Sequence, residues 1–357
     1  MDMKKLKEQM IRRNKRSFIK KEDSRLLVPS GSIMLNLACS DTINGAYVVG
    51  KVVNLIGDSS SGKTLLALSG LAEMVKNSKF DEYRLIYDDA ENACEFGIEK
   101  LFGKKVFDRV EPAYKDSNNN WCPSDTIEAF YANVQEILNS KKPFIYVLDS
   151  LDSIGSFEEK ERAEEILDAI RKDKGISGSY RMQKARLLSE ILRNIVKSIK
   201  DTKSLVLIVS QTRDDIGSRF GAKTRSGGRA LKFYSSHEIW LSVKDDLKKG
   251  DYIIGREGKV KIAKNKLTGK LRRVGFKLYY DYGVDDIGDS IDYLITNDYW
   301  QLKKRTILVE DFKVELTRDV LIEYIEKENK EKELFNLVQN KWNEIEEGLK
   351  LNRKSKF

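Results

Sequence analysis

Short apolar runs recur along the central part of the chain. They are rich in β-branched residues and nearly continuous, and they cover residues 52–56, 85–87, 144–148 and 205–209. Continuous apolar runs of this length are typical of parallel strands that are covered on both faces. The stretches between them follow helical spacing, so the pattern predicts an α/β core with a mostly parallel sheet flanked by helices.

Glycine, acidic or amide residues follow these runs at the places where open α/β sheets bind ligands. Gly57, Asp88 and Asp149 end the first three runs, and Gln211 comes shortly after the fourth. The carboxyl ends of parallel strands lie along one edge of a sheet, so these residues are expected to lie close together. Residues 238–243 and 259–263 are two further strand candidates, which we expect to add to the sheet in antiparallel fashion.

The pattern divides the chain into three segments. Residues 1–28 carry a basic helix candidate and a short strand candidate, and they are too few to bury a core. Residues 29–285 form the α/β core, and residues 286–357 form a small C-terminal α/β domain that ends on a helix. The N-terminal segment is therefore expected to pack on something else.

Composition narrows the class of protein. Lys and Arg number 65 against 56 Asp and Glu, a net charge of +9 that slightly favours a polyanionic partner such as nucleic acid. Three widely spaced cysteines and one histidine do not fit a structural zinc site or a disulfide framework. No stretch approaches the roughly 18 apolar residues of a membrane span, so we expect a cytoplasmic protein without a membrane partner.

The first run leads into a phosphate-binding motif. A strand, then Gly-x-x-x-x-Gly-Lys-Thr, then an apolar helix is the full context of the P-loop. Backbone N–H groups of such a turn surround the β-phosphate, the lysine neutralises the β and γ oxygens, and the threonine hydroxyl binds Mg²⁺. The motif predicts ATP and Mg²⁺ as cofactors, and a chance glycine-rich turn is the alternative. Its residues are Gly57, Asp58, Ser59, Ser60, Ser61, Gly62, Lys63 and Thr64.

Carboxylates after two other runs complete the candidate nucleotide site. Asp149 fits the acidic residue that supports Mg²⁺ through water, together with Thr64; a simple helix cap is the alternative. Hydrolysis also needs a group that polarises the attacking water. Asp88, Asp89 and Glu91 follow the second run, and spacing alone hardly separates them. We choose Glu91, and a solvated acidic loop is the alternative.

These motifs, taken in order, resemble those of the bacterial RecA recombinases. The resemblance covers about residues 15–285, and its most specific part is Gly-Gly-x-Ala-Leu-Lys-Phe-Tyr. The short and poorly shared C-terminal region is typical of a divergent member, such as a phage recombinase. The matching segments are residues 29–32, 57–64, 87–93, 147–150, 211–213, 227–234 and 260–266.

The resemblance implies a DNA-dependent ATPase that forms a helical filament on single-stranded DNA and exchanges strands with homologous duplex DNA. Glu91 would activate water, and Gln211 would sense the γ-phosphate at the start of a DNA-binding loop. Lys264 and Lys266 would reach the ATP of the neighbouring subunit, so that the nucleotide lies between subunits. Without the resemblance, an exposed strand edge protected by lysines is the alternative. Residues 17–20 resemble the strand by which such subunits clasp one another, and a disordered basic arm is the alternative.

Two loops are expected to hold DNA. The first covers residues 156–182 and leads into a helix with Arg186, Ser189 and Arg193 on one face; a solvated helix face is the alternative. The second covers residues 213–229 and combines basic residues with glycines. Contacts to phosphates and to base faces read no sequence. The candidate DNA-binding residues of the second loop are Arg213, Ile216, Gly217, Arg225, Gly227, Gly228 and Arg229.

The chain departs from the RecA pattern at several positions. Asp214 and Asp215 stand in the second loop where the family has uncharged and basic residues, and Glu238 replaces a basic residue. The adenine-stacking position falls on Ile98, with Phe96 nearby. The C-terminal tail is basic where that of RecA is acidic.

Two other functions are open at this point. A hexameric ring helicase shares the sheet and the P-loop, but it usually supplies an arginine across the subunit interface, whereas Lys264-Asn265-Lys266 favours a filament. A non-catalytic recombination mediator would bind ATP without hydrolysing it. The joint presence of Lys63, Thr64, Glu91 and Asp149 argues against the mediator.

Overall fold

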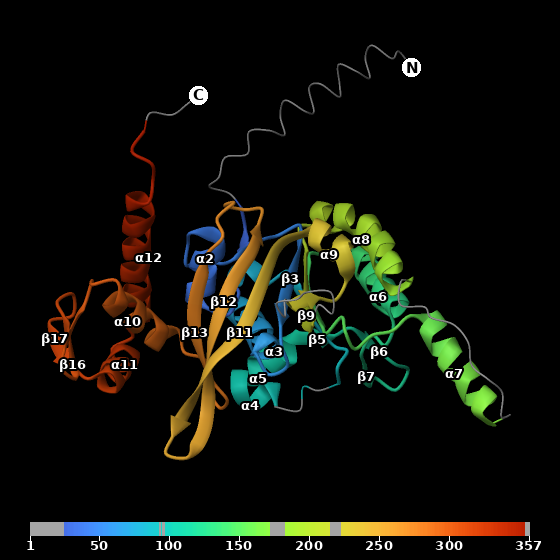
Figure 1. Ribbon diagram of the computed structural model, residues 1–357, viewed down its shortest axis with the longest axis horizontal. Coiled ribbons are helices and arrows are strands. Elements are labelled where there is room, and N and C mark those ends of the chain that lie inside the picture. The colour runs from blue at the N-terminus through green and yellow to red at the C-terminus, as the bar shows by residue number, and fades with distance from the viewer. Residues whose placement is uncertain (1–24, 93, 95–96, 172–182, 215–222, 354–357) are drawn as a thin grey trace, which may run out of the picture.

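The computed structural model describes residues 25–92, 94, 97–171, 183–214 and 223–353 (Figure 1). The candidate N-terminal helix and strand, Phe96, Ile216 and Gly217 lie outside these residues. Among the helices that are described, none combines the length and the apolar character needed to cross a bilayer.

A ten-stranded sheet forms the centre of the described part of the chain. Its order is β14-β13-β12-β11-β3-β9-β8-β4-β5, with β10 paired to β9. The strands from β11 to β5 run parallel, which confirms a mostly parallel sheet. The bounds are β3 Lys51–Gly57, β4 Arg84–Asp89, β5 Val110–Pro112, β8 Phe144–Asp149, β9 Leu205–Asp214, β10 Lys223–Arg225, β11 Ser235–Lys249, β12 Tyr252–Asn265, β13 Arg273–Tyr279 and β14 Gly283–Val284.

Helices cover both faces of this sheet, which explains the continuous apolar runs. Val53 and Leu55 of β3 point to one face of the sheet and pack in an apolar cluster with residues of α2 and α3. Val52 points to the other face and packs in a second apolar cluster with residues of α6 and α8 (Figure 1). Successive strand residues point to opposite faces, so a strand buried on both sides is apolar throughout. The bounds are α2 Ile33–Ser40, α3 Lys63–Val75, α6 Ile127–Asn139 and α8 Gln183–Asp201.

The direction of β11 differs from the expectation. Residues 238–243 were expected to be antiparallel, but β11 runs parallel to β3, with Glu238 opposite Asn54. The reason is the short helix α9 (Gly228–Tyr234), which lies between β9–β10 and β11. It carries the chain back to the end of the sheet at which β3 and β9 begin, so β11 begins there too, as in other crossovers. Only β12 and the strands after it are antiparallel.

Both expected loops contain regular structure. Much of residues 156–182 is helix α7 (Phe157–Arg171). It begins with a capping box, in which Ser156 N donates to Glu159 Oε2 (3.0 Å) and Glu159 N donates to Ser156 Oγ (3.2 Å). In the second loop β9 continues to Asp214 and pairs with β10, so Gln211 lies within the strand rather than after it.

The C-terminal region packs in the same apolar cluster as Val53 and Leu55 of β3. It contains a small antiparallel sheet in the order β15-β16-β17, and Trp342 of its last helix lies under the Arg272 guanidinium, 4.9 Å from the ring centre. The division at residue 286 stays a prediction. The bounds are α10 Asp286–Thr296, β15 Gln301–Lys303, β16 Thr306–Val309, β17 Val314–Leu316, α11 Arg318–Lys327 and α12 Glu331–Gly348.

The remaining elements are short and lie at the margins of the core. They are β1 Leu27–Val28, β2 Tyr47–Val48, η2 Ser78–Phe80, α4 Ile98–Phe102, α5 Lys104–Arg109, β6 Tyr114–Lys115 and β7 Trp121–Cys122.

Buried carboxyl groups lie on α10 and on α3 beside it. Burial raises the pKa of Asp289 to about 8, although its Oδ2 accepts a hydrogen bond from Lys277 N (2.9 Å). Burial also raises the pKa of Glu73 to about 7. An unfolded Asp has a pKa of about 3.9. Between these values the folded state keeps a proton that the unfolded state has lost, so stability falls as the pH rises through this window.

We predict that Asp289→Asn flattens this pH dependence. The amide keeps an oxygen for Lys277 N–H but cannot ionise, so the variant loses up to about 1.4 kcal/mol per pH unit of the wild-type slope. Urea unfolding at a series of pH values between about 5 and 8 measures both slopes. Parallel slopes for the two proteins would contradict the assignment.

Candidate nucleotide and DNA site

The P-loop turn joins the end of β3 to the start of α3. Gly62, the residue before α3, has φ 88°, in the left-handed region that favours glycine. A Cβ at Gly57 would lie 2.4 Å from Ser61 Oγ and 2.8 Å from Leu241 O, so only glycine fits. The P-loop turn therefore lies at the N-terminus of a helix. There the free backbone N–H groups and the helix dipole favour a bound anion.

The side chains of the turn fit a phosphate group. Ser61 Oγ is buried and has no hydrogen-bond partner within the described residues. Lys63 is only 7% exposed, and its Nζ donates to Asp58 O across the turn (2.7 Å). Burial lowers the Lys63 pKa, while Asp149, Glu91 and Asp58 act to raise it. An unpartnered hydroxyl and a buried cation inside one turn match the requirements of phosphate oxygens.

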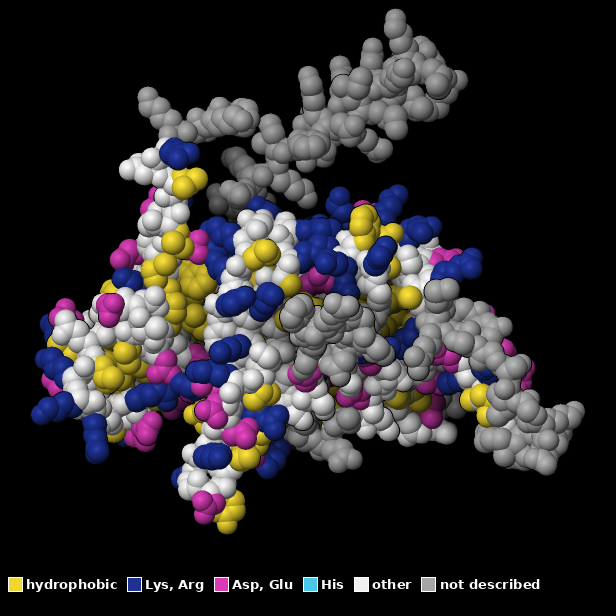
Figure 2. Space-filling view, viewed as in Figure 1, with side chains coloured by type: hydrophobic (Ala, Val, Ile, Leu, Met, Phe, Trp, Pro, Cys, Tyr) yellow, Lys and Arg dark blue, Asp and Glu magenta, His cyan; other side chains and the backbone are white. Residues whose placement is uncertain are grey.

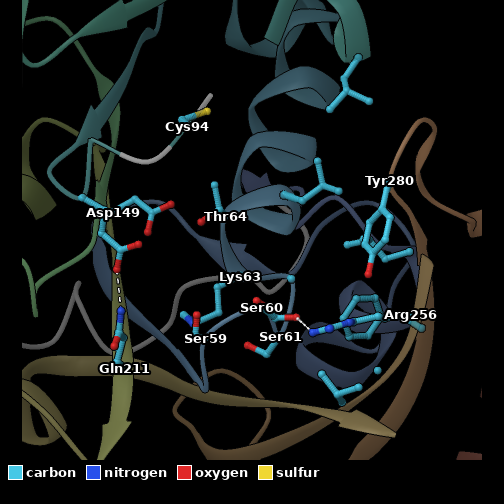
Figure 3. Close-up of a pocket in the computed structure, with 18 of the residues that line it drawn as sticks. Ser59, Ser60, Ser61, Lys63, Thr64, Cys94, Asp149, Gln211, Arg256 and Tyr280 are labelled. Atoms are coloured by element: carbon cyan, nitrogen blue, oxygen red, sulfur yellow. Dashed lines mark hydrogen bonds between the residues drawn. The ribbon is translucent and has the colours of Figure 1, made fainter. Parts of the chain in front are cut away.

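Asp149 lies at the end of β8, next to Thr64 (Figure 3). Its Oδ2 accepts a hydrogen bond from Tyr87 Oη (3.1 Å), and the Thr64 hydroxyl also bonds to the carboxylate. Burial raises the Asp149 pKa to about 6. A hydroxyl and a carboxylate are oxygen ligands of the kind Mg²⁺ prefers, with waters and phosphate oxygens filling the other positions. The pair therefore fits Mg²⁺.

Glu91 is held at the same edge by a residue of β9 and by the residue that follows β8. Its Oε1 accepts hydrogen bonds from Ser150 Oγ (2.6 Å) and Gln211 Nε2 (2.7 Å). The two rival carboxylates have other partners: Asp88 is buried between Ser124 N (2.8 Å) and Tyr146 Oη (2.5 Å), and Asp89 Oδ2 accepts from Cys94 N (3.1 Å). Asp88 does not line the pocket, whereas Glu91 and Asp89 both do, and Glu91 is hydrogen-bonded to Gln211.

One wall of the pocket was missed by sequence reasoning. It comes from β11–β13 and from the residue after β13, and Arg256 Nη1 donates to Ser60 O of the P-loop (2.8 Å; Figure 3). Phe276, Leu278 and Tyr280 alternate along the chain and line the pocket, whereas Ile98, the expected stacking position, does not. The alternation predicts that these three side chains share one face of the chain. It does not predict that this face lines the nucleotide pocket.

Lys264 and Lys266 lie at the other end of β12. Lys264 Nζ donates to the carbonyls of Lys232 and Phe233, and Lys266 Nζ donates to Phe233 O (3.1 Å). Burial, followed by repulsion from Lys266, lowers the Lys264 pKa to about 8. Arg256 contacts its own P-loop eight residues earlier on the strand, so Lys264 lies about 26 Å further along β12. The two lysines cannot reach the pocket of their own chain.

The expected DNA face of α8 is exposed. Leu188, Ile191 and Ile195 are buried against the sheet, whereas Arg186 and Arg193 are exposed and Ser189 is half-buried. This arrangement confirms the amphipathic spacing of the helix.

The base of the second loop is held by ion pairs. Arg225 Nε lies 2.5 Å from Glu238 Oε1, with the two side chains 10% and 4% exposed. Glu238, which replaces a basic residue of the RecA pattern, is thus the partner of a candidate DNA-binding arginine. Arg213 is 61% exposed and lies 3.1 Å from Asp152.

Glycines begin the helix that follows this loop. Gly227 has φ 77° and precedes α9, which starts at Gly228, and Arg229 beside it is exposed. Ile216 and Gly217 lie outside the described residues.

Comparison with known proteins supports the resemblance. A model of the RecA N-terminal domain matches residues 165–285. The chain is 30% identical over 272 residues to Protein RecA of Levilactobacillus brevis, across 76% of this chain and 64% of that protein. The chain belongs to the RecA family. Its matched part spans a little under two thirds of the length of this RecA relative.

A basic groove of this RecA-family chain was also missed. Lys259, Lys261 and Arg273 line it on the outer face of β12 and β13, and none of the three forms an ion pair within the described residues. Figure 2 shows Lys and Arg side chains gathered on this face. Val260 and Ile262 point to the opposite, buried face, so the alternation along β12 carried the signal.

We predict that Glu238→Ala destabilises the protein by about 3 kcal/mol, because it leaves the nearly buried Arg225 without a partner. Urea unfolding measures the loss, and Arg225→Ala in the same chain should recover part of it. Glu257→Ala, which breaks the more exposed pair with Lys244, is the control and should cost less than about 1 kcal/mol. Equal losses for Glu238→Ala and the control would show that the buried pair has no special weight.

Proposed function

We propose that this RecA-family protein is a DNA-dependent ATPase that forms a helical filament on single-stranded DNA and pairs that strand with homologous duplex DNA. One observation carries the proposal: Glu91 of the nucleotide pocket accepts a hydrogen bond from Gln211, and Gln211 lies on the strand that leads into the second loop. A change at the triphosphate therefore has a direct route to a DNA-binding segment. Its location would be cytoplasmic.

In this proposal the P-loop binds ATP between its backbone N–H groups and Lys63. Thr64 would hold Mg²⁺ directly and Asp149 through water, and the bound ion supplies charge that neutralises phosphate oxygens. Glu91 is the general base that positions and deprotonates the attacking water. Gln211 donates either to Glu91 or to the γ-phosphate, so it reports which nucleotide is bound.

Lys264 and Lys266 would complete the site of a neighbouring subunit. They lie too far along β12 to serve their own pocket, and carbonyls of residues 232 and 233 hold them at the opposite end of the strand. A contact between two different surfaces repeats head to tail and gives an open helix when its rotation does not close. A cation supplied across that contact couples hydrolysis to assembly.

DNA would lie along the face that α8 and the second loop share. Arg186, Ser189 and Arg193 would contact the bound strand from α8, and the basic groove at Lys259 and Lys261, on the same side of the sheet, fits the phosphates of an incoming duplex. From the second loop we propose contacts by Arg213, Ile216, Gly217, Gly227, Gly228 and Arg229. Arg225 would act there only if its ion pair with Glu238 opened.

The segments have distinct parts in this proposal. Residues 1–28 would clasp the neighbouring subunit, residues 29–285 would bind ATP and DNA, and residues 286–357 would form the accessory C-terminal domain.

We predict that Lys63→Ala abolishes DNA-stimulated ATP hydrolysis and strand exchange, because no other side chain of the P-loop neutralises the phosphate oxygens. Phosphate release with and without single-stranded DNA measures the first activity, and joint formation with homologous and non-homologous duplexes measures the second. Lys79→Ala, which removes an exposed lysine away from the pocket, is the control. Unchanged turnover in Lys63→Ala would refute the site.

We predict that Arg193→Ala weakens binding to single-stranded DNA and reduces the slope of log affinity against log salt by about 1, because one phosphate contact is lost. A titration of labelled oligonucleotide at several salt concentrations gives the slope. Lys200→Ala at the far end of α8 is the matched control. An unaltered slope for Arg193→Ala would place this face outside the DNA path.

The two rival functions predict different electron-microscopy images and different rates of ATP hydrolysis. Electron microscopy with a slowly hydrolysed ATP analogue should show helical filaments on single-stranded DNA, whereas a helicase would give closed rings. A non-catalytic mediator would bind ATP without any DNA-stimulated turnover.

A further inference from the structure

A largely buried carboxylate, Asp152, lies in the turn after β8 and has no part in the roles above. Its side chain is 11% exposed and accepts three hydrogen bonds. Oδ2 accepts from Gln211 N (2.7 Å) and Ser226 Oγ (2.6 Å), and Oδ1 accepts from Arg213 Nη2 (3.1 Å). Gln211 precedes the second loop (residues 213–229), and Arg213 and Ser226 lie near its two ends.

These donors lie on both sides of residues 215–222. Gln211 and Arg213 are on β9 before that segment, and Ser226 follows β10 after it. The side chain of Gln211 in turn donates to Glu91 in the nucleotide pocket (2.7 Å). Direct contacts therefore run from Glu91 through Gln211 and Asp152 to Ser226, at the far side of the loop.

The hydrogen bonds that Asp152 accepts are strong enough to couple the segments they join. Hydrogen bonds to an ionised carboxylate are about twice as strong as neutral ones, and more so where water is excluded. The turn itself is anchored, because Lys184 Nζ donates to Leu151 O (2.9 Å) and to Ile154 O. Pairing of β9 with β10 holds the two sides of the loop together, with Arg213 opposite Thr224. Asp152 holds that hairpin against β8.

We propose that Asp152 is a positioning residue that couples the nucleotide pocket to the second DNA loop. It fixes the backbone of Gln211, so that a displacement of the Gln211 side chain by nucleotide moves both sides of the loop together. The inference rests on the proposed function, since it needs nucleotide-dependent DNA binding to act upon.

The test compares affinity for a labelled single-stranded oligonucleotide in two nucleotide states. Fluorescence anisotropy gives the affinity with a slowly hydrolysed ATP analogue and with ADP, and the ratio of the two affinities measures the coupling. Asp152→Ala and the same-sized Asp152→Asn should lower this ratio about tenfold, the usual weight of a lost charged hydrogen bond. Without DNA, affinity for a fluorescent ATP analogue should change less than about twofold, because Asp152 does not line the pocket. With DNA bound, it should change by the same factor as the ratio.

Further variants separate coupling from a merely structural role. Ser226→Ala should lower the ratio in the same direction but less, and Asp108→Ala, which removes an exposed carboxylate paired with Lys104, should leave it unchanged. In a Gln211→Ala background Asp152→Ala should add nothing, because both act through one link. Additive effects, or equal losses of DNA affinity in both nucleotide states, would overturn the proposal.

The outcome also separates this inference from the proposed function. If the wild-type protein shows nucleotide-dependent DNA binding and both Asp152 variants keep the full ratio, only the role of Asp152 fails. If the wild-type protein shows no such dependence, the proposed function fails and the coupling fails with it.

Discussion

The nucleotide pocket buries two opposite charges at one edge of the sheet. Lys63 and Asp149 are 7% and 2% exposed, and burial shifts the pKa of each toward its neutral form. Taking ions out of water costs several kcal/mol each unless partners compensate. Phosphate oxygens and a divalent cation are the partners that would favour the charged form of both groups, so the fold holds a site whose chemistry is completed by its ligands.

The two ends of strand β12 make different contacts, and only one of them touches the P-loop of its own chain. At one end Arg256 supports the P-loop of its own chain, and at the other Lys264 and Lys266 rest on carbonyls before β11. A strand is stiff and about 3.3 Å long per residue, so both ends cannot serve one pocket. In the proposed filament both ends would have a function, and the sheet would set the distance between neighbouring sites.

Patterns within short stretches predicted the parts of the fold that depend on local physics. The parallel strands, the P-loop and the apolar face of α8 follow from spacing alone, and the box of Ser156 and Glu159 could have revealed α7. The direction of β11 depended on α9, a helix of one turn or two that spacing does not resolve. The wall at Phe276 and Tyr280, the pair of Arg225 with Glu238 and the contacts of Asp152 join distant segments, and only folding brings these together.

A mixing experiment tests whether the nucleotide site is built from two subunits. Glu91→Gln lacks the proposed base but keeps Lys264, whereas a chain with Lys264→Ala and Lys266→Ala keeps Glu91 but lacks the cations for its neighbour. Each protein alone should show no DNA-stimulated hydrolysis. In an equal mixture about a quarter of the head-to-tail contacts unite an intact base with intact lysines. We expect the mixture to recover about a quarter of the wild-type rate. A mixture as inactive as its components, or full activity of the lysine variant alone, would contradict a site built from two subunits.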